Sequence, residues 1–524
     1  MEGGILPFFM HVNTICILGG GTSGFTVASI LARYREVSGL NFSIKLVYSK
    51  DIGTIGVGES TLLSINDLFN YLNIKDSEWM KECNATYKTS IRFEDFNKGT
   101  YFQYPFGDID PRRSNASGIR QWFISKEVDS EVFSPERASL YFLPHTILAE
   151  RNKLTRDGID GFDFDRNTAY QFDAHKLGNY LRKYAEGLGV EVIDDRFIGS
   201  LRDENGFLTD LVCKDGTYDA DLFIDCSGFK SLLLGGELKE EYISFKDTSI
   251  NNKALRAKIP YTNKEEQLKS YTNCVALENG WCWEIPLWDG MSLGYVHSDK
   301  FATEEEIKRE FVNRYGNIDC ELIEFKSGVY ERGWVKNVIG VGLSYGFIEP
   351  LEGTGVATTL DNSFRMLECL SKRDMNYTSI DRDLFNYSIK KRMYSYRGLL
   401  DMHYYLSTRD DSKYWRHVTN EIDYAYDDDP FSMYNQFCVD TMIRRDYSQL
   451  NTTAGALFIV TGMNYSCFSS AITQAEISID NNILLDSNTT LFKDYLKSLE
   501  DRVKELPSTF NFLSNHIYGE ENND

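Results

Sequence analysis

Residues 13–24 read NTICILGGGTSG, an apolar run that leads into three consecutive glycines and a fourth at the end. The apolar run predicts a buried strand, and apolar residues at helical spacing in residues 25–35 predict a helix. Residues 42–48 predict a second strand. This order is the βαβ unit that binds a dinucleotide, because the glycines let the backbone approach a pyrophosphate at the helix N-terminus. The stretch therefore predicts an α/β dinucleotide-binding fold, with a glycine turn that holds no ligand as the alternative.

Two later segments extend this pattern. Residues 222–228 read LFIDCSG, and residues 338–342 read VIGVG, so that each predicts a further strand of the same sheet. At the end of the second predicted strand, Tyr48 stands where such folds usually place an acidic residue for the ribose hydroxyls. Ser49 and Asp51 are the candidates to take that role.

Composition narrows the class of protein. The chain has 524 residues and a net charge of −22, from 78 acidic and 56 basic residues. Such a charge opposes binding to nucleic-acid phosphates and to anionic membrane surfaces. No apolar run approaches the ~20 residues of a membrane span, and the ten cysteines show no metal-binding or disulfide spacing. We expect a soluble, cytoplasmic protein without a nucleic-acid partner, a membrane partner or a metal site.

Two further motifs point to a particular chemistry. Residues 281–286 read WCWEIP, and residues 349–356 read EPLEGTGV. Together with the glycine turn, they resemble the flavin-dependent halogenases of the tryptophan-halogenase type. The resemblance implies FAD as the cofactor. It also implies that reduced FAD and oxygen convert chloride, bromide or iodide to hypohalous acid, which halogenates an electron-rich aromatic substrate of the indole or phenol type.

The resemblance implies a mixed α/β fold with a Rossmann-like FAD-binding domain of the flavin monooxygenase type. Sheet insertions interrupt this domain, and a mainly helical substrate region follows it. We expect the FAD-binding module at residues 10–110, 160–250 and 335–372, and the substrate module at residues 111–159, 251–334 and 373–516. Residues 1–9 and 517–524 are expected to be extensions.

The resemblance also distributes the FAD contacts over several segments. One of them is the strap, residues 53–61, which is expected to lie between the flavin and substrate sites and to couple them. The residues expected to bind FAD are Gly19, Gly21, Thr22, Ser23, Gly24, Ser49, Asp51, Gly58, Asp225, Gly228 and Gly342.

Lys88 is the first candidate catalytic residue. Strand alternation places it with Ser90 and Arg92, opposite the apolar Tyr87 and Ile91, so the pattern alone predicts a lysine on a solvent-facing side. The family carries its catalytic lysine at this step before an Ile-x-Phe strand. An amine or ammonium there delivers the halogen by binding hypohalous acid beside the substrate carbon.

Glu352 is the second candidate catalytic residue. By resemblance it orients the halogenating species and accepts the ring proton, whereas its position before a predicted helix at residues 356–370 also suits a capping acid. Thr354 and Gly355, at the start of that helix, are expected to bind the halide through their backbone amides. The family has serine where this chain has Gly353.

Four aromatic residues are expected to shape the substrate site. Trp281 and Trp283 share one face of a predicted strand, which indicates core packing, and the resemblance makes them a wall that keeps substrate from the flavin. Phe106 matches an aromatic platform. Tyr104 stands where tryptophan-specific members have histidine, and residues 457–458 read LF where those members favour paired tyrosines. Free tryptophan is therefore not the expected substrate.

A single dinucleotide fingerprint indicates that a separate flavin reductase supplies reduced FAD as a diffusible partner. A homo-oligomer is possible. Two other interpretations stay open: a flavin-dependent aromatic hydroxylase, which shares the fold but does not need Lys88 or Glu352, and a degenerate flavin-fold binding protein.

Overall fold

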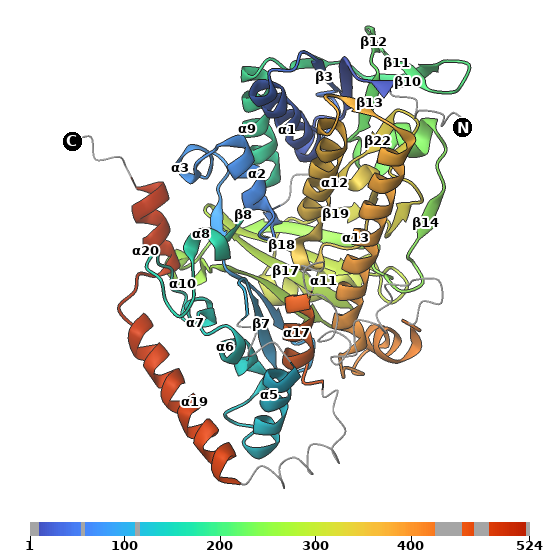
Figure 1. Ribbon diagram of the computed structural model, residues 1–524. Helices are drawn as coiled ribbons and strands as arrows, with labels where there is room; N and C mark the ends of the chain where they lie inside the picture. The colour runs from blue at the N-terminus through green and yellow to red at the C-terminus, as the bar shows by residue number, and fades with distance from the viewer. Residues whose placement is uncertain (1–9, 54–57, 110–115, 425–452, 466–481, 520–524) are drawn as a thin grey trace, which may run out of the picture. The chain divides into compact units, whose positions relative to one another are not determined.

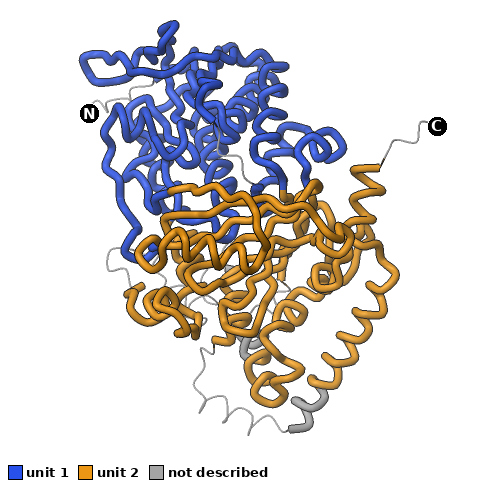
Figure 2. The backbone as a smooth tube through the Cα atoms, turned by 180° about the vertical axis from the view of Figure 1, so that it is seen from behind, with its two compact units in different colours: residues 1–85, 172–250, 325–393 blue, residues 86–171, 251–324, 394–524 orange. Residues whose placement is uncertain are grey.

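The computed structural model describes residues 10–53, 58–109, 116–424, 453–465 and 482–519 (Figure 1). The chain divides into two compact units, each assembled from three separate stretches of sequence (Figure 2). Unit 1 comprises residues 1–85, 172–250 and 325–393, and unit 2 comprises residues 86–171, 251–324 and 394–524. The chain is a mixed α/β protein, as the sequence predicts.

Unit 1 contains the predicted dinucleotide fold. Among its described residues, one sheet has the strand order β21-β22-β13-β2-β3-β9. Its outer strands are β21 (Trp334–Val335), β22 (Val338–Gly340) and β9 (Glu191–Asp194). Its centre is β2 (Thr14–Leu18), which runs parallel to β3 (Ser43–Tyr48) and to β13 (Leu222–Asp225). All residues of β13 are buried, as expected of a parallel strand covered on both faces. The βαβ prediction is confirmed in this unit.

Helices of unit 1 cover this sheet. Helix α1 (Thr22–Ser38) begins directly after the glycine turn, and α9 (Ala174–Gly187) packs beside it (Figure 1). Asp173 caps α9 by accepting a hydrogen bond from the Lys176 amide. Helix α12 (Thr354–Ser371) also contacts α1, so the starts of two helices meet the same end of the sheet.

Unit 2 is built on a mostly antiparallel sheet. Among its described residues, the strand order is β19-β15-β18-β17-β16-β6-β7. These strands include β19 (Glu321–Glu324), β15 (Lys253–Ile259) and β16 (Tyr271–Leu277). The WCWEIP motif lies on β17 (Gly280–Leu287), which pairs with β18 (Gly290–His297). Trp283 lies opposite Gly294, and its indole occupies the space that a side chain at Gly294 would fill. The tryptophans are therefore buried in a close-packed sheet face.

Helix α17 (Thr453–Gly462) packs on β7 (Tyr101–Pro105) in unit 2. A Cβ at Gly455 would lie 2.8 Å from the Tyr104 hydroxyl oxygen, so the helix approaches this tyrosine closely. Within the described residues, no helix is both long and apolar enough to cross a membrane.

Candidate active site

The glycine turn between β2 and α1 is a tight backbone cradle. Gly19 has φ 123°, and a Cβ there would overlap the carbonyl oxygen of Cys226. A Cβ at Gly24 would overlap the carbonyl oxygen of Gly19, so α1 packs directly against the turn. At Gly21, by contrast, no heavy atom lies within 4 Å of an added Cβ. The turn therefore has open space beside the helix N-terminus, which suits a pyrophosphate.

Tyr48 is fixed at the end of β3. Its ring lies 2.6 Å from where a Gly20 Cβ would stand, and its hydroxyl accepts a hydrogen bond of 2.6 Å from Arg182 Nη1. Of the two residues expected to replace the usual acid, Ser49 is half-buried and Asp51 is exposed. Both follow β3 directly, so they lie at the edge where a ribose is held in such folds.

Asp225 organises the loop that follows β13. Its carboxylate accepts hydrogen bonds from the Ser227 amide and hydroxyl and from the amides of Leu233 and Leu234, at 2.6–3.0 Å. Burial raises the pKa of this carboxyl group. These contacts within the chain hold the loop that includes Gly228, whose φ is 69°.

Gly342, in the third predicted flavin motif, lies beside the glycine turn at the start of α1. A Cβ at Gly342 would lie 2.7 Å from both Ser23 Oγ and Thr359 Oγ1, which are themselves 3.1 Å apart. The Thr22 hydroxyl donates to the carbonyl of Ala174 at the start of α9. The three motifs thus converge from distant sequence positions on one end of the unit 1 sheet, and the residues present fit a flavin dinucleotide.

Lys88 ends β5 (Thr86–Lys88) in unit 2 and is fully buried. The interpretation of a solvent-facing lysine is wrong, because every residue of β5 is buried, so that both faces of the strand are covered; β6 (Ser90–Glu94) follows after Thr89. The Lys88 amine lies 5.1 Å from the ring centroid of Phe106. An ammonium over an aromatic face gains electrostatic stabilisation in a site that water does not reach.

Glu352 lies in unit 1, in a turn whose backbone is strained. Its φ is 66° and its ψ is 1°, a left-handed conformation that is unfavourable for a residue with a side chain. The side chain is buried. Gly353, with φ 66° and ψ 29°, is the N-cap residue of α12, so Glu352 stands one residue before the cap.

The predicted halide site follows this turn. A left-handed Gly353 followed by a right-handed Thr354 directs successive backbone N–H groups to one side, which is the geometry of an anion-binding nest. Thr354 is buried, and Gly355 is half-buried. The N-terminal end of the α12 dipole adds positive potential at these amides.

The four aromatic residues expected to shape the substrate site all lie in unit 2. The ring centroids of Trp281 and Trp283 are 6.3 Å apart on one buried face of β17. Tyr104 contacts Phe106 edge-on at 6.2 Å and Phe458 of α17 at 5.8 Å. Phe106 is thus held between Tyr104 and the Lys88 amine.

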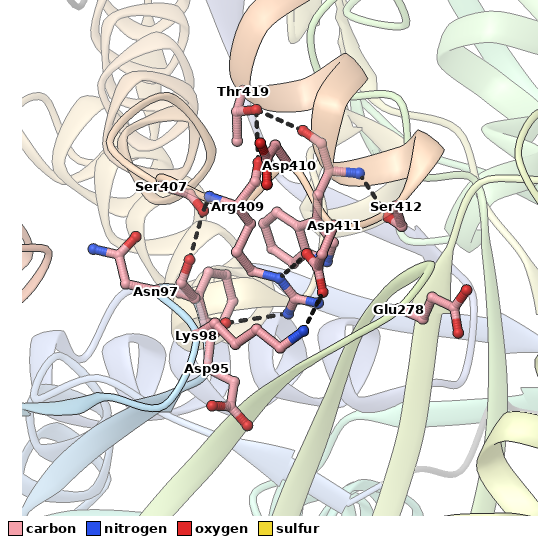
Figure 3. A network of polar contacts seen from close by, with 12 residues as sticks. Asp95, Asn97, Lys98, Glu278, Ser407, Arg409, Asp410, Asp411, Ser412 and Thr419 are labelled. Carbon is pink, nitrogen blue, oxygen red and sulfur yellow. Dashed lines mark hydrogen bonds and ion pairs between the residues drawn. The ribbon is translucent and has the colours of Figure 1, made fainter.

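A cavity of about 320 Å³ in unit 2 lies beside a charged cluster, the Arg409 network (Asp95, Asn97, Lys98, Arg409 and Asp411). Figure 3 shows Lys98, Arg409 and Asp411 pointing toward one another. Arg409 donates to both carboxylate oxygens of Asp411, at 2.9 and 3.0 Å, and to the carbonyl of Asp95. The charges compensate one another, so we interpret the network as structural.

Several contacts of the site have no signal in the sequence. The Tyr48–Arg182 hydrogen bond joins residues 134 positions apart. The backbone of Ser60 in the strap lies against Gly353, and only the unusual glycine in the EPLEGTGV motif hinted at it. Residues 54–57 of the strap lie outside the described residues.

Comparisons with known proteins agree with these features. The family model described as tryptophan halogenase matches residues 14–458. The tryptophan 7-halogenase RebH of Lentzea aerocolonigenes is 31% identical over 427 residues, which cover 77% of this chain and 78% of that protein. The tryptophan 6-halogenase ThaL of Streptomyces albogriseolus is 32% identical over 435 residues, with 78% of each chain covered.

A solved structure has the same fold over nearly the whole chain. The apo structure of VirX1 superposes with a TM-score of 0.90 at 33% identity and covers 97% of this chain and 100% of its own. The family match spans most of the sequence and includes every motif placed above. The chain therefore belongs to the tryptophan-halogenase family and is an enzyme of the flavin-dependent halogenase type.

Proposed function

We propose that this chain is a two-component FAD-dependent halogenase that uses Lys88 to deliver halogen to an electron-rich aromatic substrate. The observation that carries the proposal is the fully buried Lys88 amine beside the Phe106 ring. A fully buried lysine is rare in proteins, so an amine held beside an aromatic ring is an unusual feature of this site. Bound reduced FAD supplies the electrons with which oxygen is activated for halide oxidation, and a separate flavin reductase supplies that FAD.

The halide is held at the amides of Thr354 and Gly355. The nest and the α12 dipole favour a monovalent anion there without a charged side chain. Oxidation of the halide by two electrons forms hypohalous acid, whose O–X bond is polarised by hydrogen bonding to the Lys88 ammonium. Chloride, bromide and iodide all fit this backbone chemistry.

Two residues of this chain then supply and accept the protons that halogen transfer requires. As the C–X bond forms, the O–X bond breaks, and Lys88 gives a proton to the departing hydroxide to make water. The substituted ring is cationic and loses its proton to the Glu352 carboxylate. Burial of the Lys88 side chain keeps the hypohalous acid that it binds from bulk water, where that acid would react without selectivity.

The substrate differs from free tryptophan in this proposal. Tyr104, packed between Phe106 and Phe458, replaces the histidine of tryptophan-specific members. These aromatic contacts offer flat apolar surface, which suits an indole or phenol ring. We assign flavin binding to unit 1 and ring binding to unit 2.

The test is mass spectrometry of reactions that contain the protein, FAD, a flavin reductase, NADH, oxygen and one halide at a time. A panel of indoles and phenols serves as substrate. We expect products whose masses show replacement of hydrogen by halogen. Products with one added oxygen would instead identify a hydroxylase, and flavin oxidation without any product would support a degenerate enzyme.

The same reaction tests Lys88. We expect Lys88→Ala to lower halogenated product by about 10³-fold or more, because it removes the group that binds and polarises hypohalous acid. Lys183→Ala is the matched control, since Lys183 is an exposed lysine that pairs with Glu82. Halogenation by Lys88→Ala at the rate of the control would refute the assignment.

A further inference from the structure

Phe106 is the first residue after β7, at the point where that strand ends. Its amide donates a hydrogen bond of 2.9 Å to the carbonyl of Thr89, the residue that follows Lys88. Its carbonyl is bonded from a different element, because His145 Nε2 lies 2.9 Å from that oxygen. Phe106 is buried, so its carbonyl costs free energy when it has no donor. His145 therefore completes the backbone bonding of the residue whose ring lies beside the Lys88 amine.

His145 can only be a hydrogen-bond donor in this contact. A carbonyl oxygen accepts and never donates, so the imidazole carries its hydrogen on Nε2. The residue stands directly before α7 (Thr146–Glu150), is 4% exposed, and has its ring centroid 5.4 Å from that of Phe162. Burial lowers the pKa of the imidazole, which keeps it neutral at pH 7. A neutral, enclosed imidazole is suited to hold a carbonyl and not to carry protons.

Gly107 leaves the space that the imidazole needs. A Cβ built at Gly107 would lie 2.9 Å from Cε1 and 3.2 Å from Nε2 of His145, so a side chain there would push the ring away from the Phe106 carbonyl. Gly107 also has φ 151°, a backbone conformation that residues with a side chain rarely adopt. The glycine and the histidine together fix the backbone of Phe106, whose ring centroid lies 5.1 Å from the Lys88 amine.

We propose that His145 is a positioning residue that fixes the Phe106 ring against Lys88, so that the aromatic substrate meets the halogen held at that amine. This inference rests on the proposed function. Lys88 keeps its place in β5 when the hydrogen bond is lost, so hypohalous acid still forms and still reaches the amine. A displaced Phe106 ring holds the substrate out of line, and misplacement by about 1 Å costs on the order of 10²-fold in rate. The acid then escapes and reacts with other molecules.

The experiment follows where the halogen goes. The reaction contains the protein, FAD, a flavin reductase, NADH, oxygen, bromide and the arene that the substrate panel identifies, with free methionine added to trap escaping hypobromous acid as methionine sulfoxide. The partition ratio is the amount of brominated arene divided by the amount of bromide-dependent sulfoxide.

His145→Met removes the donor and fills the space of the imidazole with a flexible apolar side chain. We expect the partition ratio to fall by about tenfold, while the sum of the two products per flavin oxidised stays unchanged. A purely structural role of His145 would lower both products together with the amount of folded protein and leave the ratio as it is.

His145→Gln is the variant that should restore the natural behaviour. The glutamine amide supplies an N–H donor in place of Nε2, so we expect a partition ratio within about twofold of the natural one. The pH–rate profile should also be unchanged, whereas loss of one limb would make the imidazole an acid or base in the reaction. This variant covers the case in which His145→Met does not fold. A tenfold lower ratio, or a lost limb, would overturn the inference.

His516→Met is the matched control. His516 is exposed, and its Nδ1 lies 2.8 Å from the Phe512 carbonyl, so the same substitution removes a similar contact that does not involve Phe106. It should keep the natural partition ratio. An equal fall in this control, or a natural ratio in His145→Met, would also refute the role of His145. Failure of the proposed function gives a different result, because the natural protein itself then brominates no arene.

Discussion

The turn at residues 352–355 is largely buried, whereas only Arg409 is buried in the Arg409 network, and the two polar regions are built in opposite ways. In the network, Arg409 binds Asp411 through two hydrogen bonds, and Lys98 pairs with the same carboxylate. In the turn, Glu352 and Gly353 are consecutive left-handed residues. Strain of this kind persists only where the surroundings impose it, and it collects at functional sites. We therefore interpret the strained turn as a functional region and the Arg409 network as a structural one.

Glu352→Gln gives the largest expected effect and tests the functional side of the comparison. The amide keeps the shape of the side chain but cannot accept the ring proton. We expect halogenation to fall by about 10³-fold, about 4 kcal/mol, while the Kd of FAD is unchanged. Single-turnover product formation and flavin titration measure the two quantities. Unchanged turnover would assign Glu352 to the architecture of the turn alone.

Arg409→Met tests the structural side. Methionine fills the space of the stem but leaves Asp411 without its main partner, whose presence lowers the pKa of that carboxyl to about 2. We expect the variant to lose about 2 kcal/mol of stability at neutral pH, because it removes the charge-assisted hydrogen bonds of a buried guanidinium, while the exposed Asp411 stays solvated.

The paired measurements are the thermal midpoint and the activity of the remaining folded protein. Activity per folded molecule should stay at the level of the natural protein. Since the folded-state pKa of Asp411 is depressed, its stabilising contribution is present above pH ~4 and is lost as the pH falls toward 2. A variant as stable as the natural protein at pH 7 would contradict the structural interpretation.

Glu59, in the strap, tests the comparison through the pH dependence of stability. Burial raises the pKa of its carboxyl to about 7, so the folded state favours the neutral acid. Its contribution to stability is present below the unfolded pKa, near 4.3, and is lost as the pH rises through 7. Between pH 5 and pH 8, we expect the natural protein to lose about 2 kcal/mol of stability that Glu59→Gln does not lose. Thermal midpoints across that range measure it, and parallel curves for the two proteins would refute it.

Lys98→Ala gives the smallest expected effect. The Lys98 side chain is 72% exposed, so its ion pair with Asp411 is weakened by solvent. We expect a loss of less than about 1 kcal/mol. A loss as large as that of Arg409→Met, again from thermal midpoints, would show that the network acts as one unit and not mainly through the buried guanidinium.

Local sequence patterns predicted much of the fold. Strand β2, the glycine turn and α1 are continuous in sequence, and their periodicity and glycine spacing are local signals. The same holds for α12, which begins at Thr354, two residues before the predicted start. The candidate site was located by motif resemblance in these same segments.

Local patterns failed where long-range packing decides the outcome. Lys88 is buried because both faces of β5 are covered, and Phe106 packs near its amine, neither of which alternation can reveal. The Ser60–Gly353 contact joins segments nearly 300 positions apart, so only the three-dimensional fold explains the glycine.

The pairing of Trp283 with Gly294 has a consequence for engineering. The indole on β17 occupies the volume that a side chain on β18 would need, so bulk at one position requires its absence at the other. A library that varies only the WCWEIP motif changes Trp283 but leaves its partner Gly294 unchanged. Changing both positions together, with a smaller ring at Trp283 and a methyl group at Gly294, conserves core volume and opens variants of the wall that single substitutions cannot reach.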